Sequence, residues 1–157
     1  MCHTPRKQHY QKFLNEPLPI ESGLKEAVRE HFNNEIANES IESRQSAVDW
    51  LTWTFMYRRL DRNPYYYGLK SKGQEQLMEF VSEMVETAVD DLVAAKCVSA
   101  SEEEDVLQPA NLGRIASHYQ VNTQTISSFN SRMESQHAET FGRAEMLSIL
   151  CLAVEFE

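Results

Sequence analysis

The central stretch of the chain reads Ala47-Val-Asp-Trp-Leu-Thr-Trp-Thr-Phe-Met-Tyr-Arg-Arg-Leu60, and Asn63-Pro-Tyr-Tyr-Tyr-Gly-Leu69 follows it after two residues. Its apolar side chains fall on two stripes of a helix that we expect over residues 44–60. One stripe holds Val48, Leu51 and Phe55, and the other holds Trp50, Trp53, Tyr57 and Leu60. A helix with two apolar stripes is buried on two sides. This stretch therefore predicts a central helix with Trp53 in the core.

The sequence on either side of this helix predicts the order of a winged helix. Before it, apolar residues at helical spacing indicate a helix over about 24–36, for which Ser22 can act as the N-cap. After it, residues 73–95 form a long amphipathic pattern, and two short runs at 97–100 and 106–108 predict a β-hairpin. Three helices followed by a hairpin are typical of this helix-turn-helix variant.

The ends of the chain have a different character from this middle part. Residues 1–19 are polar and basic and include two prolines near their end, so they are interpreted as a connector. Helical patterns recur at about 112–119, 123–133 and 143–156, and the last is rich in large apolar residues. The prediction is a mainly α chain with a small β-hairpin: a connector at 1–19, a winged helix at 20–110 and the start of a helical domain at 111–157.

Composition and charge limit the classes of function. The 157 residues are 41% hydrophobic and 25% charged, which is typical of a soluble globular protein, and no apolar run is long enough for a bilayer. The net charge is −9, and residues 71–105 carry ten acids against two lysines. Residues 44–70 are basic instead. We expect one acidic and one basic side, which disfavours a general nucleic-acid coat.

Familiar catalytic motifs are absent from the sequence. The five glycines are too scattered for a phosphate-binding loop, and there is no nucleophile elbow. His31 and Glu35 lie one helical turn apart and could share a metal, but a partly buried histidine on the core-facing side of the helix is the favoured interpretation. No metal site is predicted, and this segment is not expected to be an enzyme by itself.

The quoted stretch, from Ala47 to Leu60 and from Asn63 to Leu69, resembles the winged-helix domain of the tandem-cassette superfamily-two (Ski-two-like) helicases. Members of that family include a large spliceosomal helicase and the helicase subunit of a signal cointegrator complex. Residues 13–22 resemble the stretch that joins the second motor domain to the winged helix. Residues 112–119 and Thr125-Ile126 resemble the entry into the family's helical, translocon-subunit-like unit. The resemblance covers nearly the whole chain.

The resemblance implies a non-catalytic structural module. In such helicases the ATPase lies on two RecA-like motor domains, so ATP and magnesium would bind the parent protein and no cofactor is expected in this segment. The implied partners are the RecA-like motor domains and the helical domain of the same parent chain, and RNA or DNA through that parent. The implied location is the nucleus, with the cytoplasm as the alternative; no membrane partner is expected.

Two candidate surfaces follow from the charge pattern. Nucleic acid could contact the basic side through Arg58, Arg59, Arg62, Tyr65 and Tyr66. The alternative is that these arginines cap the helix end and pair with a motor domain. The third helix would dock a protein through Glu79, Glu83 and Glu86. The rival hypothesis is a self-standing winged helix that reads nucleic acid or docks proteins; its recognition helix would be this acidic one, which phosphates repel.

Overall fold

The computed structural model describes residues 3–8, 10–11, 20–69, 73–101, 105–135 and 142–156, and it confirms a mainly α fold with one β-hairpin. The elements of the first part are α2 (Leu24–Ala37), α3 (Arg44–Thr52), α4 (Phe55–Arg62), a short 3-10 helix (Pro64–Tyr67), α5 (Gln74–Ala94), β1 (Val98–Ser101) and β2 (Val106–Pro109). The second part holds α6 (Asn111–Tyr119), α7 (Thr123–Ser135), α8 (Arg143–Leu150) and a 3-10 turn (Val154–Phe156). A further short 3-10 turn, Thr4–Arg6, lies in the N-terminal segment.

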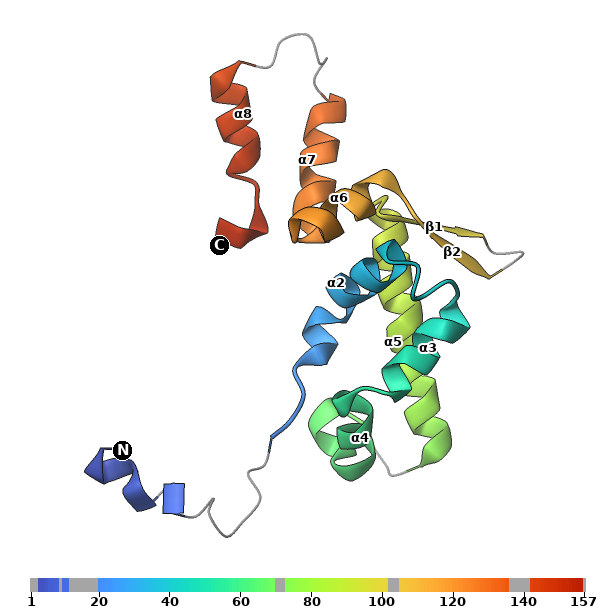
Figure 1. Ribbon diagram of the computed structural model, residues 1–157, viewed down its shortest axis with the longest axis vertical. Coiled ribbons are helices and arrows are strands. Elements are labelled where there is room, and N and C mark those ends of the chain that lie inside the picture. The colour runs from blue at the N-terminus through green and yellow to red at the C-terminus, as the bar shows by residue number, and fades with distance from the viewer. Residues whose placement is uncertain are drawn as a thin grey trace.

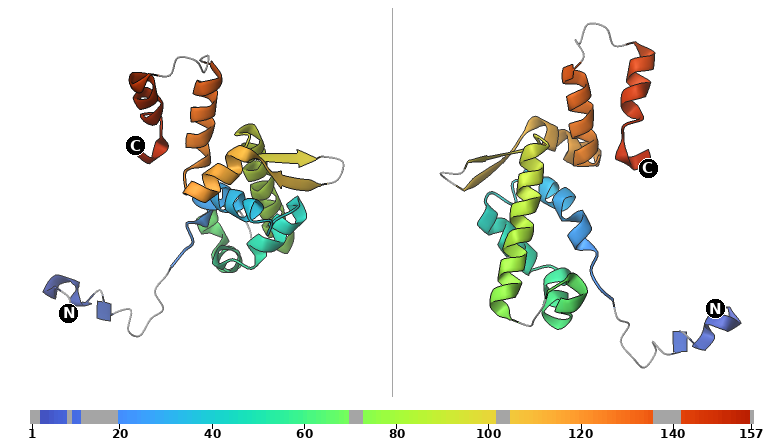
Figure 2. Two further views of the ribbon diagram at one scale, coloured as in Figure 1. Left: turned by 45° about the horizontal axis from the view of Figure 1, so that its top comes forward. Right: turned by 180° about the vertical axis from the view of Figure 1, so that it is seen from behind.

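The core lies where α2, α3 and α5 pack together, with the hairpin projecting to one side (Figures 1 and 2). Phe32, Leu51 and Leu92 come from the three helices and are fully buried. The long helix α5 keeps its apolar stripe inward and its charged residues outward, as its sequence pattern predicts. This part of the chain therefore has the arrangement expected for a winged helix.

The central helix is not continuous, and the prediction of a single helix over 44–60 is wrong. It breaks after Thr52, and Thr54 begins a new helix, with its hydroxyl oxygen accepting from the amide of Tyr57 at 3.4 Å. The break changes the helical register, so Trp50 and Trp53 do not lie on the same face of one helix. Trp50 stays on the core, edge-to-face with Phe32. Trp53 is 86% exposed, so its predicted place in the core is wrong as well.

The three tyrosines after Pro64 also differ in exposure. Tyr67 is buried, whereas Tyr65 and Tyr66 are 66% and 63% exposed, so only one of the three rings anchors this segment. Gly68 ends the 3-10 helix with a φ of 91°, a conformation that side chains strongly disfavour. The chain can therefore turn back toward α5 at this point.

The hairpin forms close to the predicted positions. β1 and β2 are antiparallel, with Val98 opposite Pro109. The amide of Leu107 also donates to the carbonyl of Glu42 at 2.8 Å, which joins the segment after α2 to the hairpin. Arg44 pairs with Asp105 at 3.5 Å. Glu102 to Glu104, between the two predicted strands, lie outside the described residues.

The second part of the chain stands at one end of the molecule, with α7 and α8 side by side (Figures 1 and 2). Ile149 and Ala153 are buried there. Much of its large apolar surface is open to solvent. The exposed residues include Met133, Met146, Leu147, Leu150, Leu152 and Phe156. The exact boundary at residues 110 and 111 stays a prediction.

Candidate functional site

The first contact between the two parts lies between α2 and α6. Gly113 packs so closely that an added Cβ would collide with the backbone carbonyl oxygen of Cys97 and would lie 2.7 Å from Oδ1 of Asn33. The amide nitrogen of the buried Asn33 side chain donates to the carbonyl of Gly113 at 3.0 Å. Its Oδ1 has no hydrogen-bond partner among the described residues. A glycine at this place lets α6 approach the winged helix at backbone distance.

The second contact fixes the beginning of α7. Glu30, one turn before Asn33 on α2, accepts hydrogen bonds from the amide of Thr123 at 3.0 Å and from its hydroxyl at 2.7 Å. Thr123 is fully buried and is the first residue of α7. A carboxylate at a helix N-terminus satisfies free amides and is favoured by the helix dipole. Glu30 therefore caps a helix of the other part of the chain.

A second carboxylate approaches the same end of α7 from the C-terminal turn. Glu155 accepts from the amide of Asn122 and from the hydroxyl of Thr125, both at 2.7 Å. The hydrogen bond from Thr125, followed by that from the Asn122 amide, lowers the pKa of Glu155. We call the contacts of Glu30, Asn33 and Glu155 with residues 113 and 122–125 the joint. It links three segments that are far apart in the sequence.

An exposed ion pair also joins the end of α5 to α7. Lys96 follows α5 with a φ of 57°, and its ammonium group lies 2.9 and 3.0 Å from the two carboxylate oxygens of Glu134 on α7. The pair lowers the pKa of Glu134. Because both side chains are well solvated, we expect this pair to contribute little stability.

A polar cluster holds the segment before α2 against α4. Arg59 binds Glu21 with two nitrogens at 2.6 and 3.1 Å, Asn63 donates to Glu21 at 2.9 Å, and the Tyr67 hydroxyl donates at 3.1 Å. These donors, first of all Arg59, lower the pKa of Glu21 to about 2. The Tyr67 oxygen also accepts from the amide of Ser22 at 2.8 Å. Arg59 is thus occupied within the fold.

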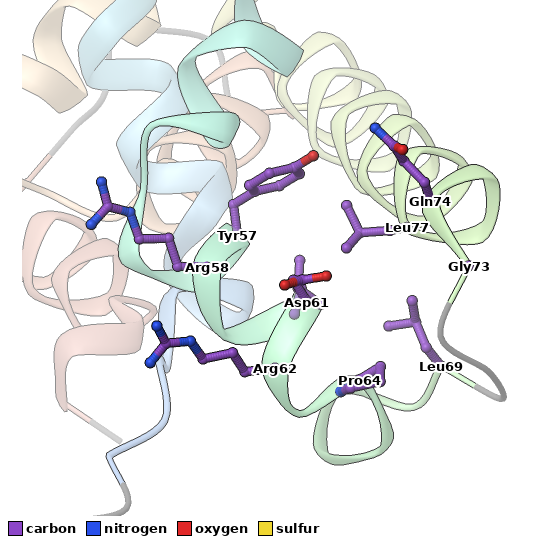
Figure 3. A pocket seen from close by; sticks show the side chains of 10 residues that line it. Tyr57, Arg58, Asp61, Arg62, Pro64, Leu69, Gly73, Gln74 and Leu77 are labelled. Carbon is purple, nitrogen blue, oxygen red and sulfur yellow. The ribbon is translucent and has the colours of Figure 1, made fainter. Parts of the chain in front are cut away.

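The structure separates the other predicted nucleic-acid residues from Arg59. Arg58, Arg62, Tyr65 and Tyr66 are exposed. Arg58 and Arg62 line an open cavity of about 620 Å³ between α4 and the start of α5 (Figure 3). Tyr57 reaches across toward α5, where its hydroxyl lies 3.8 Å from the sulfur of Met78. Binding of nucleic acid at this surface stays a prediction.

The acidic surface lies on α5. This helix has six acids and no basic residue, and Glu79, Glu83 and Glu86 are all exposed. Among the described residues, none of these three glutamates forms an ion pair; Asp91, further along, is 4.0 Å from Arg29. The predicted docking role of this face stays a prediction.

Sequence reasoning missed the residues of the joint and of the Glu21 cluster. Glu30, Asn33 and Glu155 look like ordinary polar residues of helical segments, and their partners are 93, 80 and about 30 positions away. Asn122 directly precedes α7, and its Oδ1 accepts from the amide of Gln124 at 2.8 Å. His31 is exposed, so its predicted half-buried position is wrong.

The ranges that the structure describes contain neither a metal-binding cluster nor a membrane-spanning helix. Within those ranges no group of three or more histidine, cysteine, aspartate or glutamate residues is placed to hold a metal ion. No helix in them is both long and apolar enough to cross a membrane.

Comparison with known proteins gives two family matches that follow each other along the chain. Residues 21–102 match the family described as Winged Helix-turn-helix domain, and residues 109–157 match the Sec63 Brl domain. The full chain is 44% identical over 157 residues to the U5 small nuclear ribonucleoprotein 200 kDa helicase of Drosophila melanogaster. It is 42% identical over 156 residues to an Activating signal cointegrator 1 complex subunit 3-like protein of Dictyostelium discoideum. The chain spans about 7% of the length of either relative.

Proposed function

Because the chain belongs to the winged helix-turn-helix family of the Ski-two-like helicases, continuing into a Sec63 Brl domain, we propose that it is a non-catalytic structural module of an ATP-dependent helicase. Its role is to hold the motor domains in register with the helical domain. A winged helix with its own core is suited to this role, because it presents fixed surfaces on two sides. The Drosophila relative is named as a helicase, and this chain spans only about 7% of its length.

The joint is the observation that supports this proposal. Glu30 on α2 holds the buried first residue of α7, and Asn33 one turn later holds the backbone of α6. Two hydrogen bonds from Thr123 to one carboxylate fix both distance and direction. A motion of the winged helix would therefore be passed directly to α6 and α7. This is what a module between a motor and a helical domain requires.

The cofactors, partners, substrate and location of the parent helicase belong to the same proposal. ATP and magnesium would bind outside this segment, because its sequence has no phosphate-binding loop. The partners would be the RecA-like motor domains and the rest of the helical domain, and the substrate would be RNA, in line with the spliceosomal names of several relatives. Those names also favour the nucleus as the location.

A second candidate function is a protein-docking winged helix, and the acidic face of α5 is the observation that favours it. A winged helix that reads DNA places its recognition helix near phosphates, which six acids and no base on α5 would repel. The same face, through Glu79, Glu83 and Glu86, would suit a basic protein surface. This role is compatible with the structural one, because Glu79, Glu83 and Glu86 take no part in the joint.

The test of the proposed function is strand separation in the full-length helicase that contains this chain. Glu30→Gln weakens the cap on α7, and Glu26→Gln, one turn earlier on the exposed side of α2, is the matched control. We expect Glu30→Gln to lower the amount of duplex unwound per ATP hydrolysed, while RNA-stimulated ATP hydrolysis stays within about twofold. Unwinding equal to that of the control variant would contradict the proposal.

A further inference from the structure

We propose that the groove between α2 and α5 binds an amphipathic helix of a partner protein, with the apolar side of that helix in the groove and its basic residues against α5. The groove has a volume of about 390 Å³ and lies between two helices that pack side by side (Figure 2). The inference rests on the second candidate function, protein docking through the acidic face of α5. It names the site on that face and the kind of segment that binds there.

The first argument is the apolar floor of the groove. Val28 of α2 and Met84 and Ala88 of α5 line it, and each is 9% exposed or less. The partly buried ring of Phe80 lines it as well. On α5 the lining runs from Phe80 to Asp91, which is about 16 Å of helix, or three turns. A groove of this length with an apolar floor accepts one face of a helix, whose anchors are spaced i, i+3 or i+4, and i+7.

The second argument is the charge along the α5 edge of the groove. Five exposed acids follow each other at intervals of three or four residues and therefore form one stripe on α5: Glu75, Glu79, Glu83, Glu86 and Asp90. Glu83 also lines the groove, so the stripe runs beside it. None of the five forms an ion pair with a described residue. A row of unpaired carboxylates attracts lysine and arginine and repels phosphate, so a basic protein segment is favoured over RNA.

The third argument is that the α2 edge has a different charge. This helix contributes Lys25, Glu26 and Arg29 to the lining. The ammonium nitrogen of Lys25 lies 5.3 Å from the centre of the Phe80 ring, and Arg29 reaches Asp91 at 4.0 Å. One edge thus carries two cations and one acid, whereas the other carries a row of acids. The difference favours a single orientation of the bound helix, with its basic flank turned to α5.

The experiment is a binding titration of the whole chain with three labelled probes. The first is a synthetic peptide of about sixteen residues, made of leucine, lysine and alanine, with its leucines on one helical face and its lysines on one flank. The second is a scrambled isomer of the same composition, in which the leucines share no face. The third is a single-stranded oligouridine. The scrambled isomer has the same charge, so a preference for the first peptide reports the groove.

One variant blocks the groove. Thr87 is exposed and lines it, so Thr87→Trp places a large ring where the bound helix would lie. Its matched control is Ser131→Trp, at an exposed hydroxyl residue within α7. We expect Thr87→Trp to weaken binding of the amphipathic peptide about tenfold or more, and the control to stay within about twofold.

A second variant removes charge from the stripe and gives a result even if Thr87→Trp does not fold. Glu83→Gln/Glu86→Gln should weaken binding about threefold or more. Its matched control is Glu42→Gln/Glu145→Gln, which removes the same charge from two exposed positions outside the groove. Melting temperatures equal to those of the controls would show that folding is not the cause.

The wild-type chain should prefer the amphipathic peptide to its scrambled isomer by about tenfold or more. Equal affinity for the two peptides, or no difference between either variant and its control, would overturn the groove as the site. Oligouridine binding that Thr87→Trp abolishes would overturn it too, because the groove would then belong to RNA. If the two peptides bind equally and Glu83→Gln/Glu86→Gln weakens both, docking through the acidic face stands without the groove. No binding of either peptide would remove both ideas, while the unwinding test of Glu30→Gln still decides the structural role separately.

Discussion

The two parts of the chain are stabilised in different ways. In the winged helix, α2, α3 and α5 enclose a core with Phe32, Leu51 and Leu92 fully buried. In the part after residue 110, two of the buried residues are threonines, Thr123 and Thr125, and many large apolar side chains face solvent. The first part is held by its own apolar core. The second buries fewer apolar side chains, and it is attached to the first by the polar contacts of Glu30 and Asn33 and by Leu112, which packs against the core.

This difference explains how the small winged helix can hold α6 and α7 in a fixed position. Burial of apolar surface is the main source of stability and needs no particular direction, so the winged helix can fold around its own residues. Hydrogen bonds from Glu30 and Asn33 have defined directions, and they fix how α6 and α7 are attached. The exposed apolar side of α8 is then left free for further packing.

The largest effect is expected from an aromatic residue of the first part. Phe32→Ala empties a site that is 0% exposed, and removal of such a ring costs about 3–5 kcal/mol. Trp53→Ala is the matched control, because the same kind of truncation at 86% exposure removes few contacts. Urea denaturation should show a large loss for Phe32→Ala and a change within about 0.5 kcal/mol for Trp53→Ala. Equal losses of unfolding free energy in the two variants would mean that Phe32 contributes no more to the core than Trp53.

A smaller effect is expected where the two parts meet. Gly113→Ala places a Cβ against the carbonyl of Cys97 and the side chain of Asn33, so α6 must move away from α2. The expected cost is about 1–3 kcal/mol. Gly23→Ala is the control, because its Cβ would meet nothing within 4 Å. If thermal unfolding of the two variants is the same, the close approach of α6 contributes nothing to the attachment.

The smallest effect is a dependence on pH at the Glu21 cluster. The pKa of Glu21 falls from its ordinary value of 4.5 to about 2 in the folded chain. A lowered pKa means that the stabilisation is complete above about pH 4.5 and is lost as the pH falls toward 2. Glu21→Gln should melt at a lower temperature than wild type at neutral pH, and the difference should shrink between pH 4.5 and 2. A constant difference across that range would show that the charge of Glu21 is not involved.

Sequence reasoning recovered the elements but not the contacts between them. Helical periodicity placed α5 and the hairpin to within about a residue, because each is decided by its own local pattern. It failed at Trp53, because Thr54 is an N-cap inside an otherwise continuous pattern and starts a second helix. The signal was present, since threonine is among the preferred N-cap residues. Glu30 and Asn33 gave no local signal, because their roles depend on residues 80 or more positions away.

The most direct test of the account is native-state hydrogen exchange of the intact chain and of Glu30→Gln. Exchange reports the stability of each segment separately. We expect amides of residues 77–92 in α5 to exchange only by global unfolding, and those of 146–150 in α8 to exchange much faster. Glu30→Gln should increase exchange in α6 and α7 while α5 is unchanged. Equal protection of α5 and α8, with no response of α7 to Glu30→Gln, would contradict the claim that the second part depends on its attachment to the first.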